Sequence, residues 1–153
     1  MSNYKTVFFI LGALQIILGL SMIVPILAQF FYNQLDSGFI SSGLVTIIFG
    51  VLFVLTNFDH NKKLNLPQAF LLTALSWLSI AIFGSLPFIF SEVELTITDA
   101  FFESMSGITT TGSTIITNLN ETPKAILLWR GMLQWLGGIG IIVMAITLMP
   151  IMN

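Results

Sequence analysis

Four apolar runs, each close to the length of a membrane-spanning helix, dominate this chain of 153 residues. A helix needs about 20 residues to cross the roughly 30 Å hydrocarbon core of a bilayer. Charged residues make up 8% of the sequence, against about 25% in soluble domains. We therefore predict an all-α membrane protein with four transmembrane helices. The predicted helices cover Val7–Phe31, Phe39–Leu55, Ala69–Phe90 and Ala125–Met149.

The connection between the third and fourth runs contains an apolar segment, Asp99–Ser106, that is too short to cross a bilayer. Thr96 followed by Asp99 predicts a helix start with an acidic first turn, and Gly107 is the expected stop. The polar, glycine-bearing segment Ile108–Thr114 follows. Irregular backbone at membrane depth occurs only where protein buries it or where it lines a water-filled path. We predict a re-entrant pore helix and a loop whose carbonyls face a cation; an exterior loop on an amphipathic surface helix is the alternative.

The basic residues predict the orientation of the chain. Lys5 precedes the first run, and Lys62 and Lys63 lie between the second and third. The connection 91–123 contains acidic residues and no basic residue. By the positive-inside rule, both termini lie in the cytoplasm and this connection lies outside, which predicts a multi-pass protein of the cytoplasmic (inner) membrane. The acidic residues of the connection are Glu92, Glu94, Asp99, Glu103 and Glu121.

Several residues suggest how the helices pack. Arg130 lies near the outer end of the fourth run, where it either pairs with Glu103 or Asp99 and anchors the pore helix, or extends to the interface. Trp129 is expected in an interfacial aromatic belt. Glycines spaced seven residues apart predict close packing of the first two spans, and a glycine cluster in the fourth predicts either packing on the pore helix or a gating hinge. These glycines are Gly12 with Gly19, Gly43 with Gly50, and the cluster of Gly137, Gly138 and Gly140.

Longer motifs carry a family resemblance. The segment Asp99–Thr114 resembles the pore helix and filter of the Trk/Ktr/HKT potassium transporters, and most of all their bacterial TrkH-type membrane subunit. Leu128–Val143, with its Gln-Trp-Leu-Gly-Gly run, resembles the next helix of that subunit, and Leu75–Trp77 with Gly84–Phe88 fits the preceding one. The resemblance extends over essentially the whole chain, including an N-terminal helical hairpin.

The resemblance implies a fold of four membrane–pore–membrane repeats around a central pore, each of which contributes one filter strand. Residues 1–66 then form the N-terminal hairpin with a cytoplasmic loop, and residues 67–153 form the first repeat with its filter loop. Gly112 matches a filter glycine whose replacement by serine accompanies sodium preference in some plant relatives. The implied filter residues, which would bind the transported K⁺, are Thr110, Thr111, Gly112 and Ser113. From their charges and positions, Asp99, Glu103 and Arg130 are expected to support the pore helix.

One repeat cannot enclose a pore, so three more must come from a longer chain, of which this sequence is then a fragment, or from other copies. We expect the fragment. The implied partners are the lipid bilayer, a second full subunit in a homodimer, and a cytosolic nucleotide-binding regulatory ring; no nucleic acid is expected.

The expected function is potassium uptake across the cytoplasmic membrane, with this chain supplying one of four filter repeats. The alternatives are a non-conducting membrane assembly partner and a sodium-permeable pore of the same fold. We expect no enzyme activity, because the only histidine, His60, lies in a polar loop and no catalytic set surrounds it. No cofactor is expected, and no metal other than K⁺ at the filter.

Overall fold

The computed structural model describes residues 4–58, 64–93 and 95–148, and every regular element in them is an α-helix. Seven helices follow one another in this part of the chain. They are α1 (Lys5–Ser21), α2 (Ile23–Tyr32), α3 (Gly38–Thr56), α4 (Leu66–Gly84), α5 (Leu86–Phe90), α6 (Ile97–Ile108) and α7 (Lys124–Leu148). Outside the described residues lie the expectations that concern His60, Lys62, Lys63, Glu94 and Met149.

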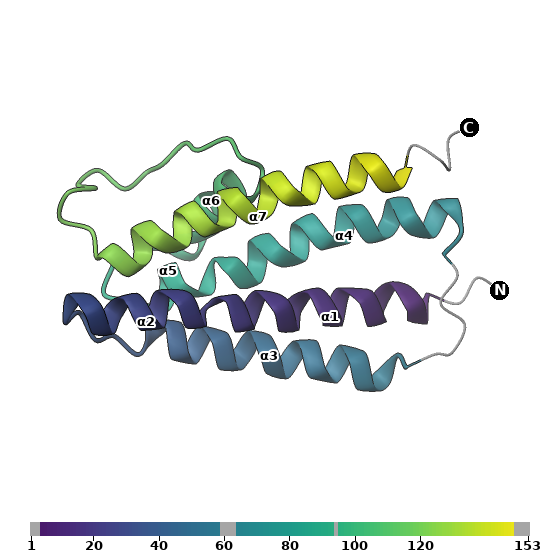
Figure 1. Ribbon diagram of the computed structural model, residues 1–153, viewed down its shortest axis with the longest axis horizontal. Coiled ribbons are helices and arrows are strands. Elements are labelled where there is room, and N and C mark those ends of the chain that lie inside the picture. The colour runs from purple at the N-terminus through teal and green to yellow at the C-terminus, as the bar shows by residue number, and fades with distance from the viewer. Residues whose placement is uncertain (1–3, 59–63, 94, 149–153) are drawn as a thin grey trace.

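Four helical stretches are long and apolar enough to cross a membrane, as predicted. Their elongated shapes run side by side along the molecule (Figure 1). The all-α fold of a multi-pass membrane protein is thereby confirmed. The division at residues 66 and 67 stays a prediction, and α4 begins at Leu66. The four stretches are Lys5–Tyr32, Gly38–Thr56, Leu66–Phe90 and, within the described residues, Lys124–Ile142.

Prolines divide the first and third stretches into two helices each. Proline has no backbone N–H, and its ring clashes with the carbonyl four residues earlier, which interrupts a helix. Pro25 stands four residues after Ser21, where α1 ends. Pro87 stands four residues after Phe83, and α4 ends at Gly84. Each break lies where the sequence removes one helical hydrogen bond.

The N-terminal hairpin is held together by glycine contacts between α1 and α3. A Cβ built on Gly12 would lie 2.7 Å from the Gly50 carbonyl oxygen, and one on Gly50 would lie 2.8 Å from the Gly12 carbonyl oxygen. A Cβ on Gly19 would lie 3.1 Å from the carbonyl oxygen of Gly43. The backbones approach so closely that no side chain fits between them, which is how small residues join membrane helices. The packing predicted from the glycine spacing is confirmed.

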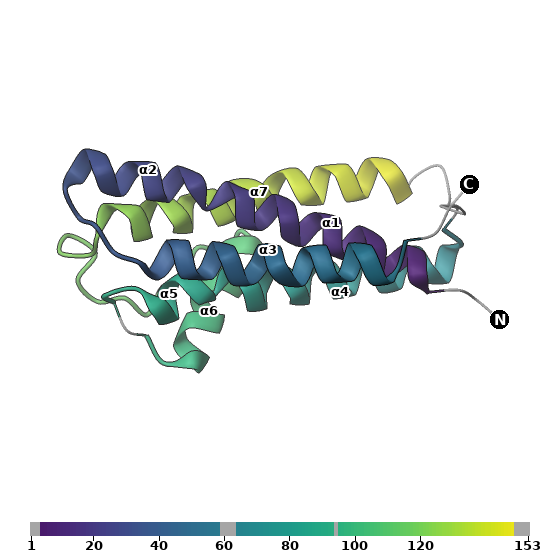
Figure 2. The same cartoon turned by 90° about the horizontal axis from the view of Figure 1, so that it is seen from below.

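Between α5 and α7 the chain enters the bundle and leaves it again at the same end, so its path is re-entrant. We call the end of the bundle where α2 and α5 end and α7 begins the loop end (Figures 1 and 2). Helix α6 runs from the loop end toward the middle of the bundle, and the chain then returns to the loop end before α7 (Figure 1). With 12 residues, α6 is about 18 Å long, well short of the thickness of a bilayer core. It packs between α4 and α7.

Trp129 lies in the core and not in an interfacial belt, so that expectation was wrong. Its side chain is fully buried, and its indole ring meets the ring of Phe39 edge-on at a centroid distance of 6.2 Å. Its Nε1–H donates to the carbonyl of Gly84 at 2.9 Å. Gly84 is the last residue of α4, and a buried carbonyl needs a donor. The break before α5 therefore creates a partner for the indole inside the bundle.

Alanine substitutions at two glycines test the packing of the hairpin. We expect Gly50→Ala to destabilise the chain by about 1–3 kcal/mol, because the new methyl group meets the Gly12 backbone and overpacks the interface. Gly131→Ala is the control, since a Cβ there meets nothing within 4 Å, and better helix propensity should stabilise α7 by up to about 1 kcal/mol. Thermal unfolding in detergent, followed by circular dichroism, compares the two. Shifts of the same sign and size would contradict the packing argument.

Candidate functional site

The start of α6 is fixed by a side-chain cap. The Thr96 Oγ1 accepts a hydrogen bond from the backbone N–H of Asp99 at 3.2 Å, and Asp99 supplies the acidic first turn. Both features agree with the sequence prediction, because a threonine cap and a carboxylate near a helix N-terminus satisfy its free N–H groups and its dipole. Within the described part of the chain, Arg130 pairs with Glu103 and not with Asp99.

Glu103 joins three segments that are far apart in sequence. Its Oε2 accepts from Arg130 Nε on α7 at 2.7 Å. Its Oε1 accepts from the hydroxyl of Thr114 at 2.5 Å and from the backbone N–H of Ile115 at 2.7 Å. We call these three contacts the Glu103 clasp. The carboxylate is fully buried, and both of its oxygens are paired. The clasp ties α6 and α7 to the non-helical segment that begins at Thr114 and leads back toward α7, which we call the returning strand.

Arg130 therefore turns inward. Its side chain is 14% exposed, and that of Glu103 is 0% exposed. A side chain that extended to the interface would keep its charged head in water, which this burial excludes. Two opposite charges buried together are stable only when they are paired and their remaining hydrogen-bonding capacity is used. The clasp meets that condition for the Glu103 carboxylate, because both of its oxygens accept hydrogen bonds.

The turn after α6 differs from the predicted one. Gly107 does not end the helix: α6 continues to Ile108, and Gly107 instead makes room for α7, since a Cβ there would lie 2.9 Å from Cβ of Leu133. The left-handed residues come later, at Thr110 (φ 60°) and Gly112 (φ 77°). Two of three consecutive residues thus have positive φ, and the backbone between them is neither helix nor strand.

Thr110 is the unusual member of this pair. Glycine adopts positive φ without cost, but for a β-branched residue such a φ is a genuine outlier. Strain of this kind persists only where the surroundings fix it, and it concentrates at functional sites. Here the surroundings include the Thr110 N–H, which donates to the Gly107 carbonyl at 2.9 Å. The hydroxyls of Thr109 and Thr111 on either side are 2.9 Å apart and share a hydrogen bond.

The predicted filter loop, residues 109–113, is held from α6 by two hydrogen bonds of Ser106. The hydroxyl of Ser106 donates to the carbonyl of Ser113 at 2.7 Å, and the N–H of Gly112 donates to the carbonyl of Ser106 at 3.2 Å. All five residues of the loop are exposed in the chain by itself. The structure therefore brings Thr110, Thr111, Gly112 and Ser113 together in one short loop at the inner end of α6.

Sequence reasoning did not single out Ser106 or Thr114 as residues whose hydroxyls bond across the turn after α6. Ser104, Ser106 and Thr114 are all small hydroxyl residues in or beside an apolar segment, and spacing alone does not tell which of them bonds across that turn. Ser104 is fully buried and its hydroxyl has no partner, whereas Ser106 and Thr114 both bond across the turn. Only the tertiary path of the returning strand separates them.

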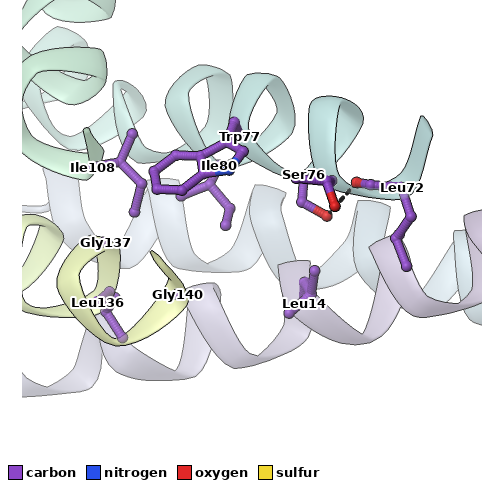
Figure 3. Close-up of a pocket in the computed structure, with 10 residues that line it drawn as sticks. Leu14, Leu72, Ser76, Trp77, Ile80, Ile108, Leu136, Gly137 and Gly140 are labelled. Atoms are coloured by element: carbon purple, nitrogen blue, oxygen red, sulfur yellow. Dashed lines mark hydrogen bonds between the residues drawn. The ribbon is translucent and has the colours of Figure 1, made fainter. Parts of the chain in front are cut away.

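An apolar cavity lies at the inner end of α6. Figure 3 shows this cavity of about 250 Å³, with Leu14 of α1, Trp77 of α4, Ile108 of α6 and Leu136 of α7 in its wall. The hydroxyl of Ser76 in that wall donates to the carbonyl of Leu72 in its own helix at 2.7 Å. A wall of this kind offers little to a dehydrated cation, which needs several oxygen atoms.

The glycine cluster of α7 divides into two kinds. A Cβ built on Gly137 would clash with the carbonyl oxygen of Ile108, so α7 touches the last turn of α6 there and only glycine fits. This contact confirms the predicted packing on the pore helix for Gly137. Gly138 and Gly140 have nothing within 4 Å of such a Cβ, and packing does not explain them.

Comparison with known proteins identifies the family. The family model of the cation transport protein TrkH matches residues 36–153, which is most of the chain. The chain belongs to the TrkH family of cation transport proteins. This descriptor names a family of transporters and not of enzymes.

Individual TrkH relatives agree over almost the whole chain. The Trk system potassium uptake protein TrkH of Escherichia coli K12 is 41% identical over 153 residues, which cover 99% of this chain and 32% of the relative. The TrkI protein of Halomonas elongata is 38% identical, covering 94% and 30%. The crystal structure of the potassium transporter TrkH from Vibrio parahaemolyticus matches with a TM-score of 0.93 at 36% identity, covering 97% and 32%. The chain thus spans about a third of the length of these relatives.

Removal of Arg130 tests the clasp. Arg130→Ala leaves the Glu103 carboxylate buried without its counter-charge, which we expect to destabilise the chain by about 3–5 kcal/mol. Adding Glu103→Gln to this variant should recover part of the loss, because the buried charge is then gone. Chemical unfolding in detergent, monitored by tryptophan fluorescence, measures both.

Lys124→Ala is the matched control for Arg130→Ala, since Lys124 is an exposed basic residue at the start of the same helix. A surface change of this kind costs about 0.5 kcal/mol or less. If Arg130→Ala is no more harmful than Lys124→Ala, the clasp does not stabilise the site.

Proposed function

We propose that this chain supplies one of the four filter-bearing repeats of a Trk-type potassium transporter. The observation that carries the proposal is the filter loop itself: a polar loop with two left-handed residues, placed at the inner end of a helix too short to span the membrane. Its position in a chain that matches TrkH relatives along almost its full length supports potassium as the transported ion.

The chemistry of the loop suits a cation. Thr110, Thr111, Gly112 and Ser113 offer backbone carbonyls that can replace the water shell of a dehydrated ion. The C-terminal end of α6 lies directly before the loop and carries the negative end of the helix dipole, which attracts positive charge. Glu103 and Arg130 hold the returning strand through the clasp, and Asp99 stabilises the start of the pore helix.

The hairpin of residues 1–66 acts as a scaffold for the repeat of residues 67–153. Near the loop end, the carboxylate of Asp36 accepts from the N–H of Gly38 at 2.9 Å and from that of Glu92 at 3.3 Å. The side chain of Gln34 accepts from the N–H of Lys124 at 3.1 Å. The α2–α3 loop of the hairpin thus contacts both the segment after α5 and the start of α7, which fixes the two units relative to each other.

The exposed filter loop needs the other three repeats to enclose a pore. They come from the same longer chain or from other copies, and the threefold greater length of the relatives supports the first source. The assembled subunit lies in the cytoplasmic membrane with both termini of this chain in the cytoplasm. It pairs as a homodimer and is regulated by a cytosolic nucleotide-binding ring. It needs no further cofactor.

Two other functions remain to be separated from this one. A sodium-permeable pore would use the same loop with different selectivity, and glycine at position 112 favours potassium. A non-conducting assembly partner would keep the helix packing but have no use for a strained loop such as the one at Thr110.

Rubidium uptake tests the function. The chain is expressed in potassium-uptake-deficient E. coli, both alone and joined to the remaining two-thirds of the E. coli K12 relative in place of the matching first third. We call the second protein the joined transporter. Gly112→Ser forces a side chain onto a backbone with φ of 77°, at a cost of about 1–2 kcal/mol. We expect it to lower rubidium uptake relative to sodium uptake about tenfold in the joined transporter.

Gly131→Ser is the control variant, because a Cβ there meets nothing within 4 Å and the substitution should leave the ratio unchanged. A joined transporter that reaches the membrane without carrying rubidium would contradict conduction and favour the assembly partner. Equal rubidium and sodium uptake before mutation would favour the sodium-permeable pore. Gly112-dependent uptake by the chain alone would mean that identical copies assemble the pore.

A further inference from the structure

Ser106 makes two contacts with the filter loop from a single position on α6. Its side chain is buried, with the residue 6% exposed. Its hydroxyl donates to the Ser113 carbonyl at 2.7 Å, and its own carbonyl accepts from the Gly112 N–H at 3.2 Å. The two bonds hold the N–H of one residue and the carbonyl of the next. The peptide units on either side of the Gly112–Ser113 peptide are therefore held relative to the pore helix.

The two contacts differ in what they require of the sequence. Any residue at position 106 supplies the backbone carbonyl, but only a hydroxyl side chain supplies the bond to Ser113. A carbonyl oxygen has two lone pairs, so that of Ser113 can accept from Ser106 and still face an ion. Without the hydroxyl, this carbonyl would be free to turn.

We propose that Ser106 is a positioning residue for ion selectivity, whose hydroxyl fixes the direction of the Ser113 carbonyl and, through it, the spacing of the filter carbonyls. The inference rests on the proposed function. Discrimination between K⁺ and the smaller Na⁺ depends on the number, field and spacing of the coordinating carbonyls. A carbonyl whose oxygen is held by the Ser106 hydroxyl cannot move toward the pore axis to fit a smaller ion. Ser106 acts through Ser113 and does not itself touch the ion.

Ser104 provides a matched control two residues away on the same helix. It is fully buried, as Ser106 nearly is, but its hydroxyl has no hydrogen-bond partner. It packs on α4, where a Cβ built on Gly84 would lie 2.7 Å from its Oγ. Ser104→Ala and Ser106→Ala remove the same atom from the same buried helix, and only the second removes a contact with the loop.

Two measurements on Ser106→Ala, Ser106→Thr and Ser104→Ala test the inference. The first is the ratio of rubidium to sodium uptake by the joined transporter, at matched protein levels in the membrane. The second is amide hydrogen exchange of residues 109–115, measured on the 153-residue chain in lipid nanodiscs, which does not require transport.

For Ser106→Ala we expect the uptake ratio to fall and loop exchange to accelerate, each by roughly two- to tenfold, the range of one hydrogen bond. Ser104→Ala should change neither, and Ser106→Thr, which keeps the hydroxyl, should retain the wild-type ratio. Unchanged loop exchange in Ser106→Ala overturns the inference, as does faster exchange with an unaltered ratio. Equal effects of the two alanine variants also overturn it. If the unmutated joined transporter carries no rubidium, the proposed function is wrong, and the role of Ser106 in selectivity is wrong with it. The exchange measurement then still tests whether the Ser106 hydroxyl holds the Ser113 carbonyl.

Discussion

The buried carboxylate of Glu103 is the interaction on which the site depends. A charge inside a membrane protein is costly unless a counter-charge and hydrogen bonds surround it, and Glu103 obtains both from two different segments. Arg130 comes from α7, and Thr114 with Ile115 comes from the strand that leaves the loop. The chain must therefore turn back along α6 to satisfy Glu103. The re-entrant path and the buried ion pair require each other.

The rest of the bundle supplies a frame in which that turn fits. Glycines bring α1 and α3 together, and Gly137 lets α7 touch the end of α6 at Ile108. At the break that ends α4, the Gly84 carbonyl accepts a hydrogen bond from the indole Nε1–H of Trp129 on α7. These contacts fix α7 against both α4 and α6, which places Arg130 beside Glu103. The close approach of α7 to α6 at Gly137 and the hydrogen bond of Trp129 to Gly84 thus determine which side chains Arg130 can reach.

The loop also shows why its strain can persist. Thr110 has an unfavourable φ, and the residues on both sides of it are tied down: Thr109 donates to the carbonyl of Met105 at 2.7 Å, and Gly112 donates to that of Ser106. A backbone conformation that costs energy is kept when several independent bonds specify it. The bonds all lead back to α6, so the pore helix serves as the template of the loop.

The sequence by itself determined the number of membrane spans, the short re-entrant helix with its Thr96 cap, and the glycine contacts of the hairpin. All of these follow from local patterns, namely apolar length, capping and helical spacing, which need no knowledge of distant residues. Tertiary structure decided which carboxylate Arg130 meets, that Gly107 packs and does not cap, that Trp129 is buried, and that Ser106 and not Ser104 contacts the loop. Each of these depends on which segments the fold brings side by side. A hydroxyl or a charge on one helix has the same local pattern whether or not a partner from elsewhere reaches it, so only the path of the returning strand assigns the partners.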